Sequence, residues 1–162
     1  MNYLNLDADK TQETVTELNI LLADYHIYYQ KLRNFHWNVI GENFFDLHAK
    51  FEEMYNDTLI KIDELAERIL TLRHQPESHL TRYLELSNIS ESPSETKDIE
   101  MIHILLEDHG KLLIQMRKAL KAADEGGDEG TIDLLGAYIR ELEKTSWMLD
   151  TWRINKTENH KK

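Results

Sequence analysis

The stretch RNFHWNVIGENFFDLHAKFEEMYNDTLIKIDELAER, residues 33–68, contains a set of five candidate metal ligands whose spacing is informative. They are His36, His48, Glu52, Asp63 and Glu67. Gly41 interrupts the apolar periodicity, so one helix is expected to end near residue 38 and a second to run from about 44 to 72. His36 then ends the apolar stripe of the first helix. The other four side chains share one arc of the second, beside its core stripe.

Helical periodicity continues on both sides of this stretch. Upstream, apolar residues recur at spacings of three and four from about 10 to 38, and Asp9 with Gln12 resembles a capping box. Downstream, Ser92, Pro93 and Glu95 have the pattern of a helix start, with a serine cap and a proline at the first helical position. This third long helix is expected to end at Gly126-Gly127.

A fourth long helix follows, and either Asp128 or Thr131 can cap it. The sequence therefore predicts an all-α, ferritin-like four-helix bundle with one long crossover, at about 74–98, that includes a short helix near 80–86. A single domain is expected over residues 1–162, with short flexible arms at about 1–8 and 156–162.

Composition excludes several classes of protein. The chain has no cysteine, which rules out disulfides, thiolate zinc sites and iron–sulfur clusters, so any metal must be held by nitrogen and oxygen ligands. No apolar run is long enough to span a membrane, and the first residues lack a secretory signal pattern, so a cytoplasmic location is expected. The net charge of −11 disfavours nucleic-acid binding and attracts cations.

The spacing of the ligand types along the second helix limits how they can act together. His48 and Asp63 are fifteen positions apart, which is about 22 Å at the helical rise, whereas metal–ligand bonds are about 2 Å. A two-fold axis would bring His48 of one chain to Asp63 and Glu67 of a second, antiparallel chain. We expect two identical sites per dimer, each built from both chains.

Imidazole and carboxylate ligands together suit both Fe(II) and Fe(III), as a ferroxidase requires. The ordinary ferritin arrangement within one bundle needs two Glu-x-x-His motifs, and only Glu100-x-x-His103 is present. Simpler interpretations stay open: His36 can be a core histidine, and Asp63 with Glu67 can be a surface pair that Arg68 neutralises.

Two segments of the chain resemble the signature stretches of the Dps family, the miniferritins or DNA-binding proteins from starved cells. The first is H-W-N-V-I-G-x5-L-H-x3-E, from His36 to Glu52, and the second is I-D-E-L-A-E-R, from Ile62 to Arg68. After the leucine that follows this second motif, the family usually has a small or turn-forming residue. Here that position is Arg73, which is expected to lengthen or redirect the end of the second helix.

The resemblance implies a hollow shell of twelve subunits with ferroxidase centres at two-fold interfaces. It implies that His36 and His48 are ligands from one subunit, that Asp63 and Glu67 are ligands from the other, and that Glu52 binds iron directly or through water. It further implies that Fe(II) is oxidised, preferably by hydrogen peroxide and otherwise by oxygen, and stored as Fe(III) mineral. Trp37 matches a tryptophan proposed to trap oxidising equivalents, and a packed interface aromatic is the alternative.

The family's three-fold pores suggest an acidic lining here. The lining residues would be Asp124, Glu125, Asp128, Glu129 and Asp133, with helix capping and a solvated loop as the alternative. DNA-binding members of the family carry a lysine-rich arm. Neither terminus here has one, so weak or absent DNA binding is expected. A DNA-packing protein and a non-catalytic helical interaction shell are the competing functions.

Overall fold

The structure, a computed structural model, describes residues 4–92, 94 and 97–159, and all regular elements in this part of the chain are α-helices. The helices are α1 (Ala8–Asn38), α2 (Phe44–Thr71), α3 (Leu80–Leu86), α4 (Asp98–Gly126) and α5 (Glu129–Asn159). The all-α prediction is confirmed. None of these helices is both long and apolar enough to cross a membrane.

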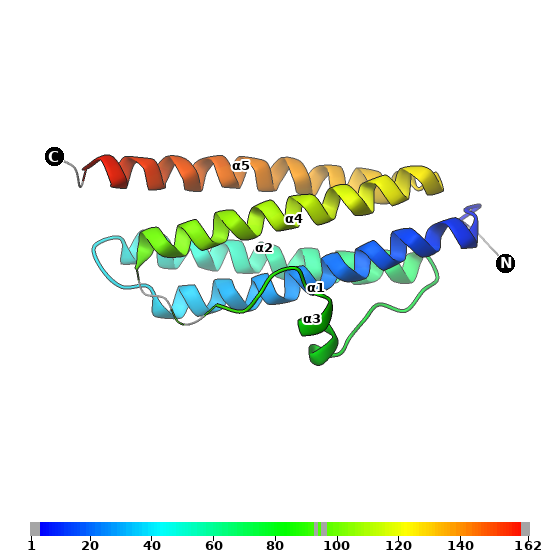
Figure 1. The fold of residues 1–162 in the computed structure, drawn as a ribbon, viewed down its shortest axis with the longest axis horizontal. Coiled ribbons are helices and arrows are strands. Elements are labelled where there is room, and N and C mark those ends of the chain that lie inside the picture. The colour runs from blue at the N-terminus through cyan, green and yellow to red at the C-terminus, as the bar shows by residue number, and fades with distance from the viewer. Residues whose placement is uncertain (1–3, 93, 95–96, 160–162) are drawn as a thin grey trace.

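The four long helices lie side by side along the long axis of the molecule (Figure 1). Helix α1 packs against α2 and α4, α4 packs against α5, and the short helix α3 packs on the outer side of α1. Short connections join α1 to α2 and α4 to α5, whereas the segment between α2 and α4 runs back along the bundle and includes α3. This is a four-helix bundle with one long crossover.

The core consists of the apolar stripes of the long helices, and its largest fully buried side chains include Tyr25, Phe35 and Phe51. Several buried polar side chains in it are paired across helices. The Lys31 ammonium lies 2.5 Å from the Asp108 carboxylate, which joins α1 to α4. Such buried pairs fix how two helices pack, because an unpaired charge would be costly there.

The first helix begins slightly earlier than the sequence predicted. Its cap is Asp7, whose carboxylate accepts a hydrogen bond of 3.0 Å from the amide of Asp9, so the predicted capping box at Asp9 and Gln12 is wrong. Helix α2 ends in a left-handed turn at Arg73, with φ of 68°. The amide of His74 donates to the carbonyl of Ile69, so Arg73 does not lengthen the helix.

The largest error concerns the start of α4. The Ser92-Pro93 pattern predicted a helix start there, but Ser94 is not helical and α4 begins at Asp98. Pro93 and Glu95 lie outside the described residues. The Asp98 carboxylate accepts a hydrogen bond of 2.5 Å from the side-chain amide of Asn43, and it places a negative charge in the first turn of α4.

The other end of the bundle agrees better with prediction. Helix α4 ends at Gly126, followed by Gly127 with φ of 70°, as expected. Helix α5 extends to Asn159, so residues 156–159, assigned to a flexible arm by the sequence, are helical. Residues 1–3 and 160–162 lie outside the described residues.

The crossover is held to α1 by buried polar contacts. The Asp24 carboxylate accepts hydrogen bonds from the hydroxyl of Ser87 (2.9 Å) and the amide of Asn88 (2.6 Å). Burial raises the pKa of Asp24, while these hydrogen bonds oppose the shift. The ring of Tyr83, in α3, stacks on His26 at 4.0 Å between centroids. These contacts fix the short helix over α1.

Candidate metal centre

The two histidines of the signature stretch meet where α1 ends and α2 begins. Their rings stack at 3.7 Å between centroids, 20° from parallel. Nδ1 of His36 lies 2.8 Å from the carbonyl oxygen of His48, and Nδ1 of His48 lies 2.8 Å from the carbonyl oxygen of His36. The structure thus brings together two residues that the sequence separates by twelve positions, and each holds the other's ring in place.

These reciprocal contacts decide which nitrogen of each ring carries the hydrogen. A main-chain carbonyl can only accept a hydrogen bond, so Nδ1 must be the donor in both rings. Nε2 of each neutral ring then keeps its lone pair, which is the form that binds a metal. The ring of His36 is only 8% exposed and that of His48 is half-buried, so both are held rigidly near the surface.

Aromatic side chains surround the pair. The ring of Phe44 stacks on His48 at 4.9 Å, and Tyr55 presents its edge to His36 at 5.4 Å. The hydroxyl of Tyr55 donates a hydrogen bond of 3.4 Å to the carboxylate of Glu52, the third predicted ligand. Sequence reasoning missed this role of Phe44 and Tyr55. Their spacing, four before His48 and three after Glu52, is the signal that could have found them.

Trp37 follows His36 directly but points elsewhere. Its side chain is 58% exposed, and the guanidinium of Arg33 lies 4.7 Å from its ring centroid, a favourable cation–π contact. An exposed tryptophan on a single protomer agrees equally well with packing at an interface and with trapping oxidising equivalents, so both interpretations of Trp37 stay predictions.

The two remaining predicted ligands lie exposed on α2, far from the histidines. Asp63 and Glu67 are separated from His48 by fifteen and nineteen residues of continuous helix, about 22 and 28 Å. Arg68 does not neutralise them. Its guanidinium pairs with Asp128, and its Nε donates to the hydroxyl of Thr131 at 2.9 Å. The neutralisation by Arg68 is therefore wrong, whereas a simple surface pair stays open as the alternative.

One protomer does not gather a full ligand set. Over the described ranges 4–92, 94 and 97–159, no three His, Asp or Glu side chains lie close enough together to hold a metal ion. The Glu100-x-x-His103 motif does not change this, because both side chains are exposed and the histidine lies 3.5 Å from Glu107. The histidine pair lies where α1 meets the start of α2, and the carboxylate pair lies toward the other end of α2.

The acidic residues predicted to line a pore separate into two groups. Asp128 is 1% exposed and caps α5, accepting hydrogen bonds from the amide (3.0 Å) and hydroxyl (2.6 Å) of Thr131. With Arg68 as its ion-pair partner, it has the capping role that was the alternative to the pore. The other side chains are exposed around the α4–α5 connection and stay predictions: Asp124, Glu125, Glu129 and Asp133.

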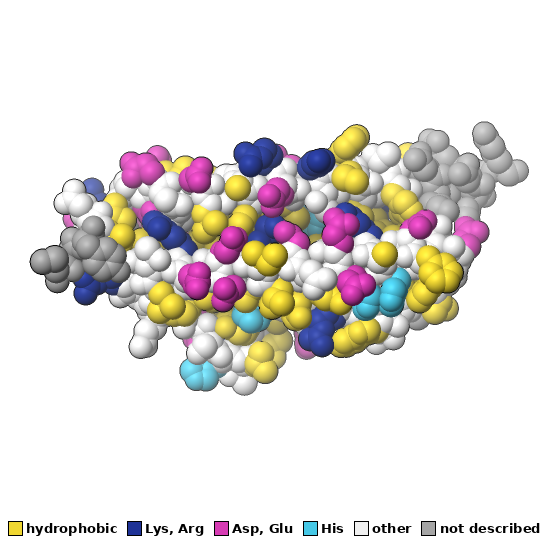
Figure 2. All heavy atoms as spheres, turned by 180° about the vertical axis from the view of Figure 1, so that it is seen from behind, with side chains coloured by type: hydrophobic (Ala, Val, Ile, Leu, Met, Phe, Trp, Pro, Cys, Tyr) yellow, Lys and Arg dark blue, Asp and Glu magenta, His cyan; other side chains and the backbone are white. Residues whose placement is uncertain are grey.

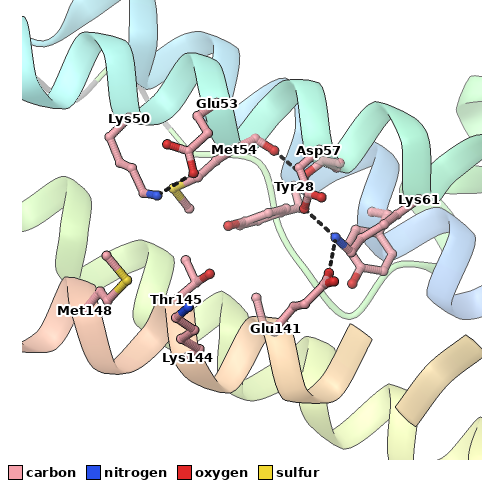
Figure 3. A pocket seen from close by; sticks show the side chains of 13 residues that line it. Tyr28, Lys50, Glu53, Met54, Asp57, Lys61, Glu141, Lys144, Thr145 and Met148 are labelled. Carbon is pink, nitrogen blue, oxygen red and sulfur yellow. Dashed lines mark hydrogen bonds and ion pairs between the residues drawn. The ribbon is translucent and has the colours of Figure 1, made fainter. Parts of the chain in front are cut away.

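A cleft of about 480 Å³ lies between α2 and α5, and its polar lining is largely paired (Figure 3). Lys61, at its centre, lies 2.5 Å from Asp57 and 3.1 Å from Glu141, and Lys50 lies 2.8 Å from Glu53. Burial raises the pKa of Tyr25, which forms part of the lining. Because these carboxylates already have cationic partners, the cleft is a poorer cation site than either end of α2.

Comparisons with known proteins agree with the fold. A family model described as Ferritin-like domain matches residues 15–157. The "DNA protection during starvation protein" of Brevibacillus brevis is 42% identical over 135 residues, 83% of this chain and 91% of that protein. The "DNA protection during starvation protein 2" of Bacillus anthracis is 39% identical over 138 residues, 85% of this chain and 94% of that protein.

A solved structure is similar over nearly the whole bundle. The crystal structure of the Dps protein from Vibrio cholerae, described as a member of a broad superfamily of ferritin-like diiron-carboxylate proteins, matches with a TM-score of 0.91 at 45% identity. The match covers 94% of this chain and 96% of that chain, so the crossover and both helix pairs lie within it.

Proposed function

Because the chain belongs to the Dps family of ferritin-like proteins, we propose that it binds Fe(II), oxidises it at centres shared by two protomers and stores the Fe(III) product in a hollow shell. The observation that carries this proposal is the reciprocal pairing of His36 and His48, in which Nδ1 of each ring donates to a carbonyl and Nε2 of each keeps its lone pair. A core histidine pair would not need a carboxylate-rich face on the same helix.

The proposed centre combines the two ends of α2. His36, His48 and Glu52 of one protomer would bind Fe(II) together with Asp63 and Glu67 of a two-fold partner. Neutral imidazole favours Fe(II) and carboxylate favours Fe(III), so this set tolerates both oxidation states. Five side chains leave coordination positions open, which an oxidant can use.

The reaction is a two-electron oxidation with hydrogen peroxide as the proposed oxidant. Two Fe(II) ions give one electron each, the O–O bond breaks, and two protons complete two water molecules. Dioxygen is the alternative acceptor. The Fe(III) ions hydrolyse and mineralise inside the shell, which removes iron and peroxide together and so limits oxidative damage.

The proposed shell contains twelve protomers with centres at its two-fold interfaces. Fe(II) would reach the interior through openings lined by exposed acidic residues near the α4–α5 connection, namely Asp124, Glu129 and Asp133. Asp128 is no longer part of this proposal, because it is buried against Arg68.

The shared centre can be tested by assembling two variants together, each of which is expected to be inactive alone. His48→Ala removes the histidine half and Asp63→Ala removes the carboxylate half, so each pure variant should lose fast Fe(II) oxidation. In a mixed dimer one of the two centres keeps both intact halves. Random mixing therefore restores roughly a quarter of the normal burst of oxidation, since half of all dimers are mixed.

The matched control for this mixture is a variant that carries both substitutions, mixed with His48→Ala protein. No pairing of these two chains contains an intact centre, so oxidation should stay at the level of the pure variants. Assembly is followed by size-exclusion chromatography in every sample. A mixture of the single variants that assembles but stays inactive would mean that His48 and Asp63 are not the two halves of one shared centre.

DNA packing is the second candidate function, because relatives are named for DNA protection. The net charge of −11 opposes it, since an acidic surface repels a phosphate backbone. A gel-shift titration over a range of salt concentrations distinguishes the two functions: we expect no retardation near physiological salt, and tight retardation there would favour the DNA-packing function.

A further inference from the structure

The outward face of α2 carries large apolar side chains as well as the predicted ligands. Phe45 is 83% exposed and Leu70 is 53% exposed, at opposite ends of the helix. At 100° per residue, these two side chains lie within about 20° of the same line along the helix as Glu52 and Asp63. Figure 2, which shows the molecule from behind, has hydrophobic, acidic and histidine side chains side by side on one face.

An antiparallel two-fold pairing of this face has a definite register. If Glu52 lies opposite the partner's Asp63, a pairing that the proposed centre allows, the axis crosses α2 between residues 57 and 58. The same register sets His48 opposite the partner's Glu67 and Phe45 opposite the partner's Leu70. Nearest each end of the paired helices, the apolar pair Phe45–Leu70 is therefore followed by the ligand pair His48–Glu67.

We propose that Phe45 and the partner's Leu70 form an apolar contact at each end of the α2–α2 interface, and that these two contacts set the register that completes the metal centre. The inference rests on the proposed function, because the position of the two-fold axis was derived from the pairing of the proposed ligands. Symmetry doubles the contact, so both ends of the interface bury a phenyl ring and a leucine side chain that are exposed on one protomer.

Neighbouring registers of the two α2 helices bring less compatible side chains together. A shift of three residues in one direction sets Phe45 against the partner's Glu67, which would place an apolar ring over a carboxylate and remove water from it. A shift of four residues in the other direction sets Leu70 against the partner's Ala49 and leaves Phe45 opposite His74. Only the register that pairs Phe45 with Leu70 joins two large apolar side chains at both ends.

Disulfide trapping tests this register well because the chain contains no cysteine. Residues 45 and 70 of one chain are about 37 Å apart along α2, so a Phe45→Cys/Leu70→Cys variant cannot form a disulfide within a chain. Mild oxidation of the assembled variant should give covalent dimers on a non-reducing gel. Phe45→Cys alone and Leu70→Cys alone should stay monomeric, because the like positions are also about 37 Å apart across the axis.

A charge exchange provides an independent measurement if the cysteine variant assembles poorly. Phe45→Asp should weaken dimers at least tenfold, because it sets a carboxylate against the partner's leucine. Adding Leu70→Lys to the same chain should recover most of that loss by pairing opposite charges. Leu70→Lys added to the normal chain should not strengthen the dimer. Dimer dissociation is read by analytical ultracentrifugation across a dilution series.

The cross-linking and mixed-variant experiments distinguish an error in the proposed register from an error in the proposed function. If the double-cysteine protein assembles without cross-linking, or the single variants cross-link equally well, the register is wrong, even where the mixed His48→Ala and Asp63→Ala proteins recover oxidation. If cross-links form while those mixed proteins stay inactive, the Phe45–Leu70 contact holds and the shared iron centre is wrong.

Discussion

His36 and His48 each donate the Nδ1 hydrogen to the other's main-chain carbonyl oxygen, over 2.8 Å in both directions. The pair joins the last turn of α1 to the second turn of α2, and it fixes both rings in the tautomer that presents Nε2. A single arrangement therefore closes the α1–α2 corner and keeps the Nε2 lone pairs that the proposed iron centre uses.

Replacing His36 or Asp63 by alanine should separate the structural role from the ligand role. His36→Ala removes a hydrogen bond to His48 and a nearly buried ring, so the free energy of unfolding should fall by roughly 1–3 kcal/mol. Asp63 is exposed, and Asp63→Ala should change it by less than about 0.5 kcal/mol. Both variants should lose fast Fe(II) oxidation while still assembling, as measured by stopped-flow absorbance and urea unfolding. Normal oxidation in both would remove them from the ligand set.

Asp128 and Asp133 should behave differently although both lie near the α4–α5 connection. Asp128→Asn leaves the guanidinium of Arg68 without its buried partner, so the unfolding free energy should fall by roughly 2–4 kcal/mol. The matched variant Asp133→Asn changes an exposed carboxylate; stability should hold, and Fe(II) uptake into assembled shells should slow. Equal stability of the two variants would contradict the capping role of Asp128.

Arg73 stores conformational strain at the end of α2. Its φ of 68° is a left-handed conformation that costs a non-glycine residue about 1–2 kcal/mol. Arg73→Gly and Arg73→Ala both remove the long side chain, but only glycine removes the strain, so the glycine variant should be more stable by about 1 kcal/mol. Thermal unfolding of the two proteins side by side measures this difference. An alanine variant as stable as the glycine variant would show that the turn relaxes.

His109 should make the protein less stable in mild acid. It accepts a hydrogen bond from the hydroxyl of Tyr28 and donates one to Ser146, and burial lowers the pKa of His109 to about 4 from an ordinary value of 6.5. Between these values the unfolded chain binds more protons, so stability falls as the pH drops from 6.5 toward 4. The loss should approach roughly 3 kcal/mol from this residue.

The matched variant for this pH dependence is His109→Gln, which keeps a polar side chain but cannot take up a proton. The raised pKa values of Asp24 and Asp108 give the opposite slope in both proteins, so only the difference between their urea unfolding curves reports on His109. Parallel pH profiles for the two proteins would assign the acid sensitivity to other groups.

Much of the fold could be predicted from periodicity, because the core stripes and the turn glycines are local signals. The short helix at residues 80–86 and the end of α4 at Gly126 were predicted at their observed positions. The start of α4 was not, because the serine–proline pattern imitates a cap, whereas the observed start has a tertiary contact between Asn43 and Asp98. Sequence spacing alone does not show such a contact.

The candidate site was predictable in its ligand types but not in its supporting residues. Helix length alone separates His48 from Asp63, so the division into halves follows from the sequence. The mutual hydrogen bonds of the histidines, and the packing of Phe44 and Tyr55 around them, depend on how α1 meets α2. The burial of Asp128 likewise depends on Arg68, sixty positions earlier in the chain.

The length of α2 has a genetic consequence. If each chain lends its histidine end to one neighbour-shared centre and its acidic end to another, a faulty copy of the gene expressed beside a sound one would act in a partly dominant way. A copy damaged at one end would spoil one centre of each mixed pair, and a copy damaged at both ends would spoil two. The severity of an allele would then depend on whether it alters the histidine end of α2, the acidic end, or both.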